Sequence, residues 1–176
     1  MALEALSQTL PPYARDVGAN LVAIAAEQVL TEPQKWGCFV AAAHAVATPA
    51  VVQAVGAAAA AAGQTAAQAA AKGAAAIMAQ NNIYFRALSL LKNPEYRALR
   101  SRLRMSITLN PGVPKDDFDL WCVAVSAIHG CPDCLDAHEG ALRSRGVSAE
   151  AVQAALRIAA VVHAASRVVA AVAAET

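Results

Sequence analysis

Aromatic residues and charges are scarce in this chain of 176 residues. Phe, Trp and Tyr make up only 5% of it, whereas apolar residues reach 57%, much of that alanine. Alanine has the highest helix propensity, and its small side chain lets helices pack closely. The net charge of +1 excludes the basic footprint of a protein that binds nucleic acid or an anionic membrane. The composition therefore favours one helical domain over residues 1–176.

No Asp, Glu, Lys or Arg occurs between Trp36 and Ala71, which raises the question of a membrane span. Pro49, Gly56 and Gly63 interrupt this stretch, and alanine is only weakly hydrophobic. The N-terminus also lacks the basic segment that begins a secretory signal, and it carries Glu4 instead. We therefore expect helices buried against other helices, no membrane span and a cytoplasmic protein.

Basic residues do gather in one short segment, despite the near-neutral total charge. Four arginines lie within eight residues of each other, at Arg97, Arg100, Arg102 and Arg104. Because the net charge is only +1, we interpret this cluster as a solvated helix end or a subunit contact.

Helix-starting and helix-breaking residues divide the chain into a series of helices. Thr31 and Gln34 form the pattern of a capping box, and Thr48 with Pro49 marks another helix start. The longer helices are predicted over residues 31–47, 48–62, 64–91, 115–129, 131–145 and 148–174. Residues 105–109 alternate in polarity, but five isolated residues cannot form a sheet. The sequence therefore predicts an all-α fold.

Self-comparison indicates an internal repeat with an offset of 85 residues. Trp36 aligns with Trp121, and a histidine eight positions further on is also shared. We predict two copies of a helical unit, over about residues 30–91 and 115–176. The first copy has no counterpart of the cysteine motif described next, so we expect it to be a scaffold.

Cys131 and Cys134 are separated by two residues and stand at a predicted helix start, where Pro132 suits the first helical position. Cys134 and His138 are four residues apart and therefore share one helix face. A helix N-terminus lowers a thiol pKa, and an imidazole can accept the thiol proton. Outside an oxidising compartment, such a cysteine pair is more often redox-active or metal-binding than structural. The motif therefore indicates a reactive dithiol.

Asp119 lies on the preceding predicted helix, in one stripe with Cys122, Ser126 and Gly130. A sharp turn at Gly130 would fold the motif helix back, so that Asp119 could approach His138 and orient its imidazole. The residues alone favour a plainer interpretation, in which Asp119 is a first-turn carboxylate that the helix dipole stabilises.

Several segments together carry a resemblance to a known family. The matching segments are residues 118–121, 124–128 and the motif from Cys131 to Glu139, with further similarity at 30–37, 73–82, 103–105 and 110–115. This pattern resembles alkyl hydroperoxidase D, within the wider carboxymuconolactone decarboxylase-like superfamily. The resemblance covers nearly the whole chain and implies an all-helical protein, usually a homotrimer, that reduces organic hydroperoxides.

The resemblance also implies roles for individual residues. Cys134 would become the sulfenic acid, whereas Cys131 would donate a proton and then close a Cys131–Cys134 disulfide. His138 and Asp119 would form the proton relay. No metal or bound cofactor is implied. Dihydrolipoamide on a lipoylated protein would supply electrons, and a partner peroxiredoxin would receive them.

Two positions depart from the family pattern. The relay carboxylate is commonly glutamate, and Asp119 is one methylene shorter. The residue before the second cysteine is often histidine, and here it is Asp133. A carboxylate beside a thiolate raises the thiol pKa and so works against reactivity. We therefore expect slower peroxidase turnover with the dithiol–disulfide function retained.

Three alternatives remain open at this point. The chain could be a redox adaptor that passes electrons from a lipoyl domain to a peroxiredoxin, with little peroxidase activity of its own. It could be a lactone decarboxylase-like enzyme, although that reaction has no use for a dithiol. It could hold zinc through Cys131, Cys134 and His138 with Asp119, although this cluster lacks a convincing fourth ligand and a second knuckle.

The remaining chemically distinctive residues are predicted to be structural. They are the packed or helix-end histidines His44 and His129, the buried cysteines Cys38 and Cys122, and the core anchors Trp36 and Trp121. His163 on the last predicted helix is expected to be structural, although a helix that crosses behind the site could use it.

Overall fold

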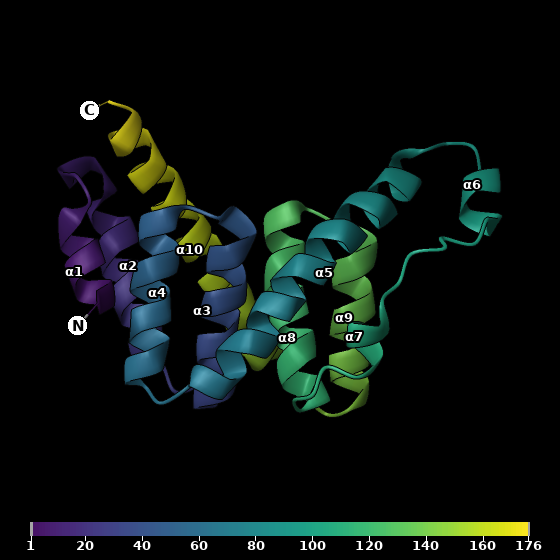
Figure 1. Cartoon of the computed structure of the whole chain (residues 1–176), viewed down its shortest axis with the longest axis horizontal. Helices are drawn as coiled ribbons and strands as arrows, with labels where there is room; N and C mark the ends of the chain where they lie inside the picture. The colour runs from purple at the N-terminus through teal and green to yellow at the C-terminus, as the bar shows by residue number, and fades with distance from the viewer. Residues whose placement is uncertain (1, 176) are drawn as a thin grey trace.

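The computed structural model describes residues 2–175, which form helices and no strand (Figure 1). The elements are α1 (Ala2–Thr9), the 3-10 turn η1 (Pro12–Ala14), α2 (Arg15–Ala26), α3 (Glu32–Val46), α4 (Pro49–Ala61), α5 (Thr65–Leu90), α6 (Glu95–Ala98), α7 (Ser106–Leu109), α8 (Lys115–His129), α9 (Pro132–Ser144) and α10 (Ala149–Ala174). Helices α1, α2 and α4 lie at one end of the molecule, and α8 and α9 lie towards the other (Figure 1). The prediction of an all-α fold is confirmed.

Two sets of three helices share their order and their lengths. Helices α3 and α8 have 15 residues each, α4 and α9 have 13, and α5 and α10 have 26. The starts of these pairs lie 83, 83 and 84 residues apart, not 85. The helix order agrees with two similar units, whereas the 85-residue offset stays a sequence prediction.

Local sequence signals explain where the helices begin. The Thr31 hydroxyl accepts a hydrogen bond from the Gln34 backbone N–H, and the Gln34 side chain accepts one from the Thr31 N–H, so the predicted capping box is present. Ser148 caps α10 in the same way by accepting from the Ala151 N–H at 3.1 Å. Each cap satisfies N–H groups that the first helical turn leaves without partners.

The core is centred on the packing of α3 against α8. Trp121 is completely buried, and its indole N–H donates to the Gln34 carbonyl at 3.2 Å. The ring lies directly on the backbone of α3 at Gly37, where an added Cβ would stand 2.1 Å from ring atom Cε2. Trp36 is also buried, and its N–H donates to Glu32 at 2.8 Å. Both tryptophans are core anchors, as predicted.

The uncharged stretch from residue 36 to 71 does not form one span, because α3, α4 and α5 share it. Within the described residues, α10 is long and apolar enough to cross a bilayer by length and composition alone. However, Val152, Ile158 and Val162 of α10 are buried in the core, and α10 packs against α8 and α3. A core helix passes the same test, so this finding is weak evidence for a membrane span.

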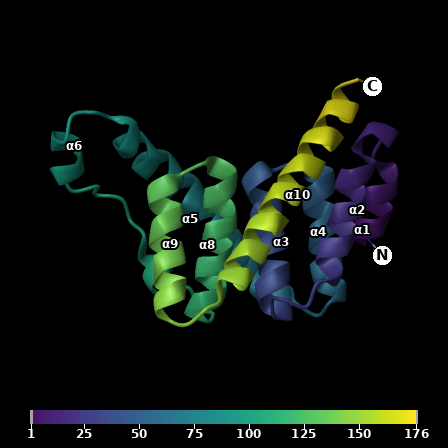
Figure 2. The ribbon, with the colours of Figure 1, turned by 180° about the vertical axis from the view of Figure 1, so that it is seen from behind.

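The end of α5 and the segment up to α7 project from the body of the molecule (Figures 1 and 2). All residues from 90 to 100 are exposed in this arm, including Leu90 at 76% and Leu99 at 65%. The four clustered arginines also lie in the arm and are exposed. The alternating residues 105–109 are not a strand, and most of them form the short helix α7.

Candidate active site

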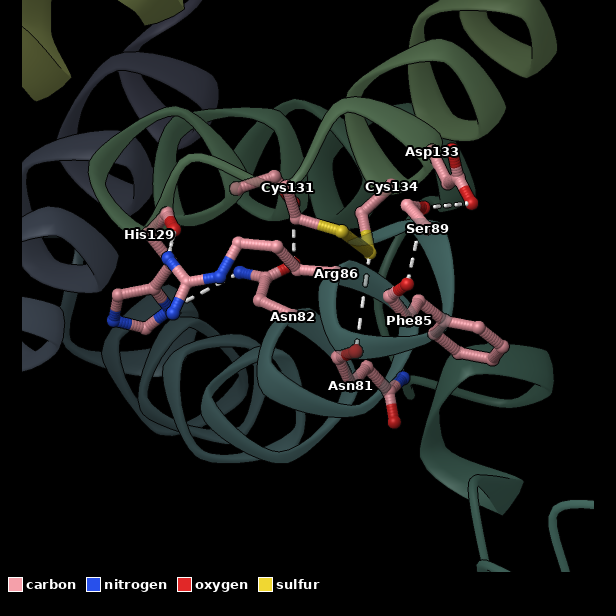
Figure 3. The surroundings of a disulfide bond; sticks show 10 residues. Asn81, Asn82, Phe85, Arg86, Ser89, His129, Cys131, Asp133 and Cys134 are labelled. Atoms are coloured by element: carbon pink, nitrogen blue, oxygen red, sulfur yellow. Dashed lines mark hydrogen bonds between the residues drawn. A yellow bond between two sulfur atoms is a disulfide. The ribbon is translucent and has the colours of Figure 1, made fainter. Parts of the chain in front are cut away.

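Cys131 and Cys134 form a disulfide at the start of α9 (Figure 3). Cys131 is the N-cap residue, and Cys134 lies in the first turn, with a Cα–Cα distance of 5.4 Å. Cys131 is fully buried, whereas Cys134 is 5% exposed and is therefore the sulfur nearer to solvent. The pairing that the family resemblance implied is present in the structure.

The turn between α8 and α9 holds the disulfide in place. Gly130 ends α8 with a φ of 63°, a conformation that glycine adopts without steric cost. The Cys131 N–H then donates to the Ser126 carbonyl at 3.2 Å, which ties the first cysteine back onto α8. Pro132 occupies the first helical position, as predicted. The sulfur pair thus sits where two helix ends meet.

Helix α5 lies along the other side of the disulfide (Figure 3). The Cys134 sulfur lies 4.0 Å from the Asn81 carbonyl oxygen. About two helical turns further along α5, the Ser89 hydroxyl donates to the Asp133 carboxylate at 2.5 Å. Asp133 is therefore engaged with α5, although it is the immediate neighbour of Cys134 in the sequence.

A polar network beneath the disulfide joins α5 to α8. The Ser126 hydroxyl donates to the Asn82 amide oxygen at 3.0 Å, and the Asn82 amide nitrogen lies 3.1 Å from His129 Nδ1. Because the amide N–H₂ can only donate, Nδ1 of His129 is the acceptor and that ring nitrogen carries no proton. Burial lowers the pKa of His129, which favours the same neutral form. His129 is thus a packed helix-end histidine, as predicted.

Arg86 completes this network from α5. Its guanidinium donates to the carbonyl of His129, the last residue of α8 before the Gly130 turn (Figure 3). Sequence reasoning did not single out Arg86 or Ser89, because both act through contacts more than forty positions away along the chain.

Asp119 and His138 meet as a hydrogen-bonded pair. His138 Nδ1 lies 3.0 Å from the Asp119 carboxylate oxygen Oδ1, which brings α8 and α9 together on the face that carries the motif. Asp119 is buried, and His138 is largely so. The plainer interpretation, in which Asp119 is only a first-turn carboxylate that the helix dipole stabilises, is therefore wrong: the first-turn acids of α8 are Asp116 and Asp117, and Asp119 contacts His138.

Two cations also bind Asp119. Lys115 Nζ lies 2.6 Å from Oδ1, and the Arg145 guanidinium lies 2.6 Å from Oδ2. Burial alone would raise the pKa of Asp119, but the hydrogen bonds from His138, Lys115 and Arg145 outweigh it and lower the pKa to about 2. Asp119 is therefore ionised at neutral pH.

Sequence reasoning missed both of these cations. Lys115 precedes Asp119 by four residues on one helix, so their spacing on a shared helix face is a signal that could have identified the pair. Arg145 lies 26 positions after Asp119, and only the fold brings the two together.

Cys122 adds a third group beside the relay pair. Ligand atoms of Asp119, Cys122 and His138 lie within 4.8 Å of one another, close enough to share a metal ion. However, two cations already bind the carboxylate, and burial raises the pKa of the Cys122 thiol far above its usual range, so the sulfur stays protonated. The alternative zinc site considered from the sequence would use the sulfurs of Cys131 and Cys134, and these two sulfurs are joined to each other as a disulfide. The donor set fits a proton relay better than a metal centre.

The remaining residues of interest lie apart from this site. Cys38 is a fully buried free cysteine on α3, as predicted. His44 is partly buried, and His163 is exposed on α10. An apolar cavity of about 390 Å³ lies between α1, α2, α3 and α4, and a second cavity of about 370 Å³ lies between the end of α8 and α10, where His163 lines it. Neither lining includes a cysteine of the motif or the Asp119–His138 pair, so we place the candidate active site at the disulfide.

Comparison with known proteins agrees with this assignment. Residues 94–175 match the model of the carboxymuconolactone decarboxylase family. The chain is 51% identical over 174 residues to "Alkyl hydroperoxide reductase AhpD" of Hyphomonas neptunium, covering 99% of this chain and 97% of that protein. It is 48% identical to the protein of the same name from Maricaulis maris, covering 97% of this chain and 99% of that protein. The chain therefore belongs to the alkyl hydroperoxide reductase AhpD family, within the carboxymuconolactone decarboxylase-like superfamily.

Proposed function

We propose that this protein is a thiol-dependent alkyl hydroperoxide reductase. The observation that carries the proposal is the Cys131–Cys134 pair at the start of α9, with the Asp119–His138 hydrogen bond of 3.0 Å beside the same helix. The names of the two relatives support the same activity. A paired dithiol with a histidine base provides both a nucleophile and a group that accepts its proton.

The chemistry proceeds in two steps on the reduced protein. The Cys134 thiolate attacks the O–O bond of a hydroperoxide, which gives a Cys134 sulfenic acid and, after one proton is taken up, an alcohol. The Cys131 thiol then attacks the sulfenic sulfur, so that water leaves and the disulfide forms. Cys134 takes the first role because it is the more exposed sulfur and lies within the helix dipole of α9.

His138 accepts the thiol proton of Cys134 and supplies the proton that the leaving alkoxide needs. The two residues are four positions apart on α9 and so share a face. With its Nδ1 hydrogen directed to Asp119, the imidazole offers Nε2 as the base. Asp119 thereby fixes the tautomer, as the third group does in nucleophilic sites generally.

Dihydrolipoamide returns the disulfide to the dithiol by thiol–disulfide exchange, and it supplies two electrons and two protons in doing so. A lipoylated protein carries this donor, and a peroxiredoxin is a second acceptor of electrons from the dithiol. The reaction requires no bound cofactor or metal, and we place it in the cytoplasm, where such thiols are kept reduced.

We also propose that the protein is a homotrimer. The exposed Leu90 and Leu99 of the projecting arm support self-association, because large apolar side chains on a protruding segment commonly mark an interface. Light scattering of the purified protein should give the mass of three chains, and the mass of one chain would contradict the proposal.

The second candidate function, a redox adaptor with little peroxidase activity, rests on Asp133. Asp133 precedes Cys134 in the first turn of α9, and its carboxylate accepts a hydrogen bond from Ser89 at 2.5 Å. Negative charge at this position disfavours the Cys134 thiolate and so slows attack on peroxide. Reduction of the disulfide by a donor thiol is less affected, because the attacking thiolate then belongs to the donor.

Steady-state peroxide consumption separates the two candidates. The wild type and Asp133→His are supplied with dihydrolipoamide and an organic hydroperoxide, each with and without a peroxiredoxin. A peroxidase consumes peroxide without the peroxiredoxin, and Asp133→His consumes it faster. Consumption by the wild type only when the peroxiredoxin is present would identify the adaptor.

A further inference from the structure

Asp119 has more hydrogen-bond donors than a simple aspartate–histidine pair requires. Oδ1 accepts from Lys115 at 2.6 Å and from His138 at 3.0 Å, while Oδ2 accepts from Arg145 at 2.6 Å. The carboxylate is buried, and it contacts His138. The single negative charge of Asp119 therefore lies against the two positive charges of Lys115 and Arg145, in addition to the imidazole of His138.

The position of Arg145 at the end of α9 brings its guanidinium to Asp119. It is the C-cap residue of α9 and follows His138 by seven positions, or about two helical turns, so it lies on the same side of the helix. Its guanidinium also donates to Asp116 at 2.5 Å, one turn before Asp119 on α8. Two carboxylates from α8 thus hold the guanidinium across the gap between the helices.

We propose that Arg145 is a positioning residue of the proton relay, which holds Asp119 against His138 and offsets the charge of the carboxylate. The role of the relay itself rests on the function proposed above. Lys115 contributes to the same charge balance from the other oxygen. Neither residue contacts the reacting sulfur, so each acts only through Asp119.

The physical reason is the balance of charge around the imidazole. A lone buried carboxylate stabilises an imidazolium beside it, and a ring that already carries that proton cannot accept one from a thiol. With Lys115 and Arg145 on the carboxylate, that stabilisation is reduced while the hydrogen bond that orients Nδ1 remains. The other groups facing the pair are Cys122, which is protonated, and Asp116, which is itself paired with Arg145.

The same arrangement accounts for the shorter relay carboxylate in this chain. An aspartate reaches less far than the glutamate common in the family. Arg145 and Lys115 hold the Asp119 oxygens from both sides, and the His138 contact is a normal hydrogen bond at 3.0 Å. The side chains of Lys115 and Arg145 are 40% and 35% exposed, so each can be exchanged without opening the core.

The first test is the titration of His138 by NMR in the disulfide form, where no thiol proton interferes. We expect Arg145→Gln to move the midpoint upward by about half a pH unit to one unit, because a cation near the carboxylate is lost. Lys115→Gln should move it in the same direction, and Arg145→Lys should restore it. Arg143→Gln is the control, since Arg143 pairs with the exposed Glu139, donates to the Val147 carbonyl and lies outside the hydrogen bonds to Asp119.

The second test is the rate of peroxide reduction against pH for the same variants in reduced form. For Arg145→Gln, the acid limb of the rate–pH profile should shift to higher pH together with the NMR midpoint. The variant should therefore be up to about tenfold slower than the wild type at low pH and should recover the wild-type rate as pH rises. A merely structural role would lower the rate at every pH.

These outcomes separate the two proposals. An unchanged or lowered His138 midpoint in both Arg145→Gln and Lys115→Gln, or a failure of Arg145→Lys to restore it, would overturn the charge-balancing role. A wild type that does not reduce peroxide would overturn the proposed function instead, and the titration result would still stand.

Discussion

At the scale of single residues, Asp119 links the stability of the fold to the chemistry of the site. It is a buried carboxylate that accepts hydrogen bonds from His138, Lys115 and Arg145. Its pKa falls from the usual 3.8 to about 2, despite burial that acts in the opposite direction. A lowered carboxyl pKa means that the folded protein binds a proton less readily than the unfolded chain does.

This difference predicts a pH dependence of unfolding. The ionised Asp119 stabilises the fold by about 2 kcal/mol above pH 4, and this contribution is lost as pH falls towards 2. Urea unfolding should therefore show a larger gap between the wild type and Asp119→Asn at pH 6 than at pH 3. An equal gap at both values would show that the Asp119 pKa is not lowered in the folded protein.

The sequence predicted the site residues unevenly. Spacing alone placed Cys131, Cys134 and His138 at one helix start. Cys131 and Cys134 are three positions apart and Cys134 and His138 are four, and each spacing is about one helical turn. The approach of Asp119 to His138 was an option that the residues alone did not favour. The Arg145 contact was not foreseen, because it depends on the angle at which α9 folds back on α8, and no local spacing encodes that angle.

At the scale of the elements, the contact of α3 with α8 depends on one glycine. A Cβ at position 37 would stand 2.1 Å from the ring of Trp121, far inside contact distance. Trp121 is fully buried and its indole N–H is bonded to Gln34, so the ring cannot swing away. The two helices must separate or the ring must leave its pocket if position 37 gains a side chain.

We therefore expect Gly37→Ala to destabilise the protein by about 1–3 kcal/mol, the usual cost of overpacking a core. Gly140→Ala on α9 is the matched control, because nothing lies within 4 Å of its added Cβ. That substitution should raise stability by about 0.5–1 kcal/mol through helix propensity. Thermal unfolding of both variants gives the comparison, and equal effects would contradict the packing argument.

Helix boundaries were the most predictable feature at this scale. The capping box at Thr31, the proline at position 49 and the serine at position 148 each act within one turn, so their effect is visible in the sequence. The two-unit order of helices was also foreseen. The offset was not reproduced by the helix starts, because matching residues such as Trp36 and Trp121 stand at different positions within α3 and α8.

At the scale of the whole molecule, the fold separates a scaffold from a reactive end. The second unit carries the disulfide, the relay and the Arg145 contact, whereas the first unit packs through α3 and α4 against α1 and α2 around an apolar cavity. Helix α5 joins the two, because it belongs to the first unit and yet lies along the disulfide through Asn81 and Ser89 (Figure 3). The projecting arm was not foreseen, since its exposure follows from tertiary packing and not from its composition.

The most direct test of the account is to mix the fully reduced protein with an organic hydroperoxide in a stopped-flow instrument, trap sulfenic acid and map it by mass spectrometry. We predict a rapid adduct on Cys134 that gives way to the Cys131–Cys134 disulfide. Cys131→Ser should accumulate the adduct, because the thiol that closes the disulfide is missing. An adduct on Cys131, or no adduct while dihydrolipoamide still reduces the disulfide quickly, would contradict the account.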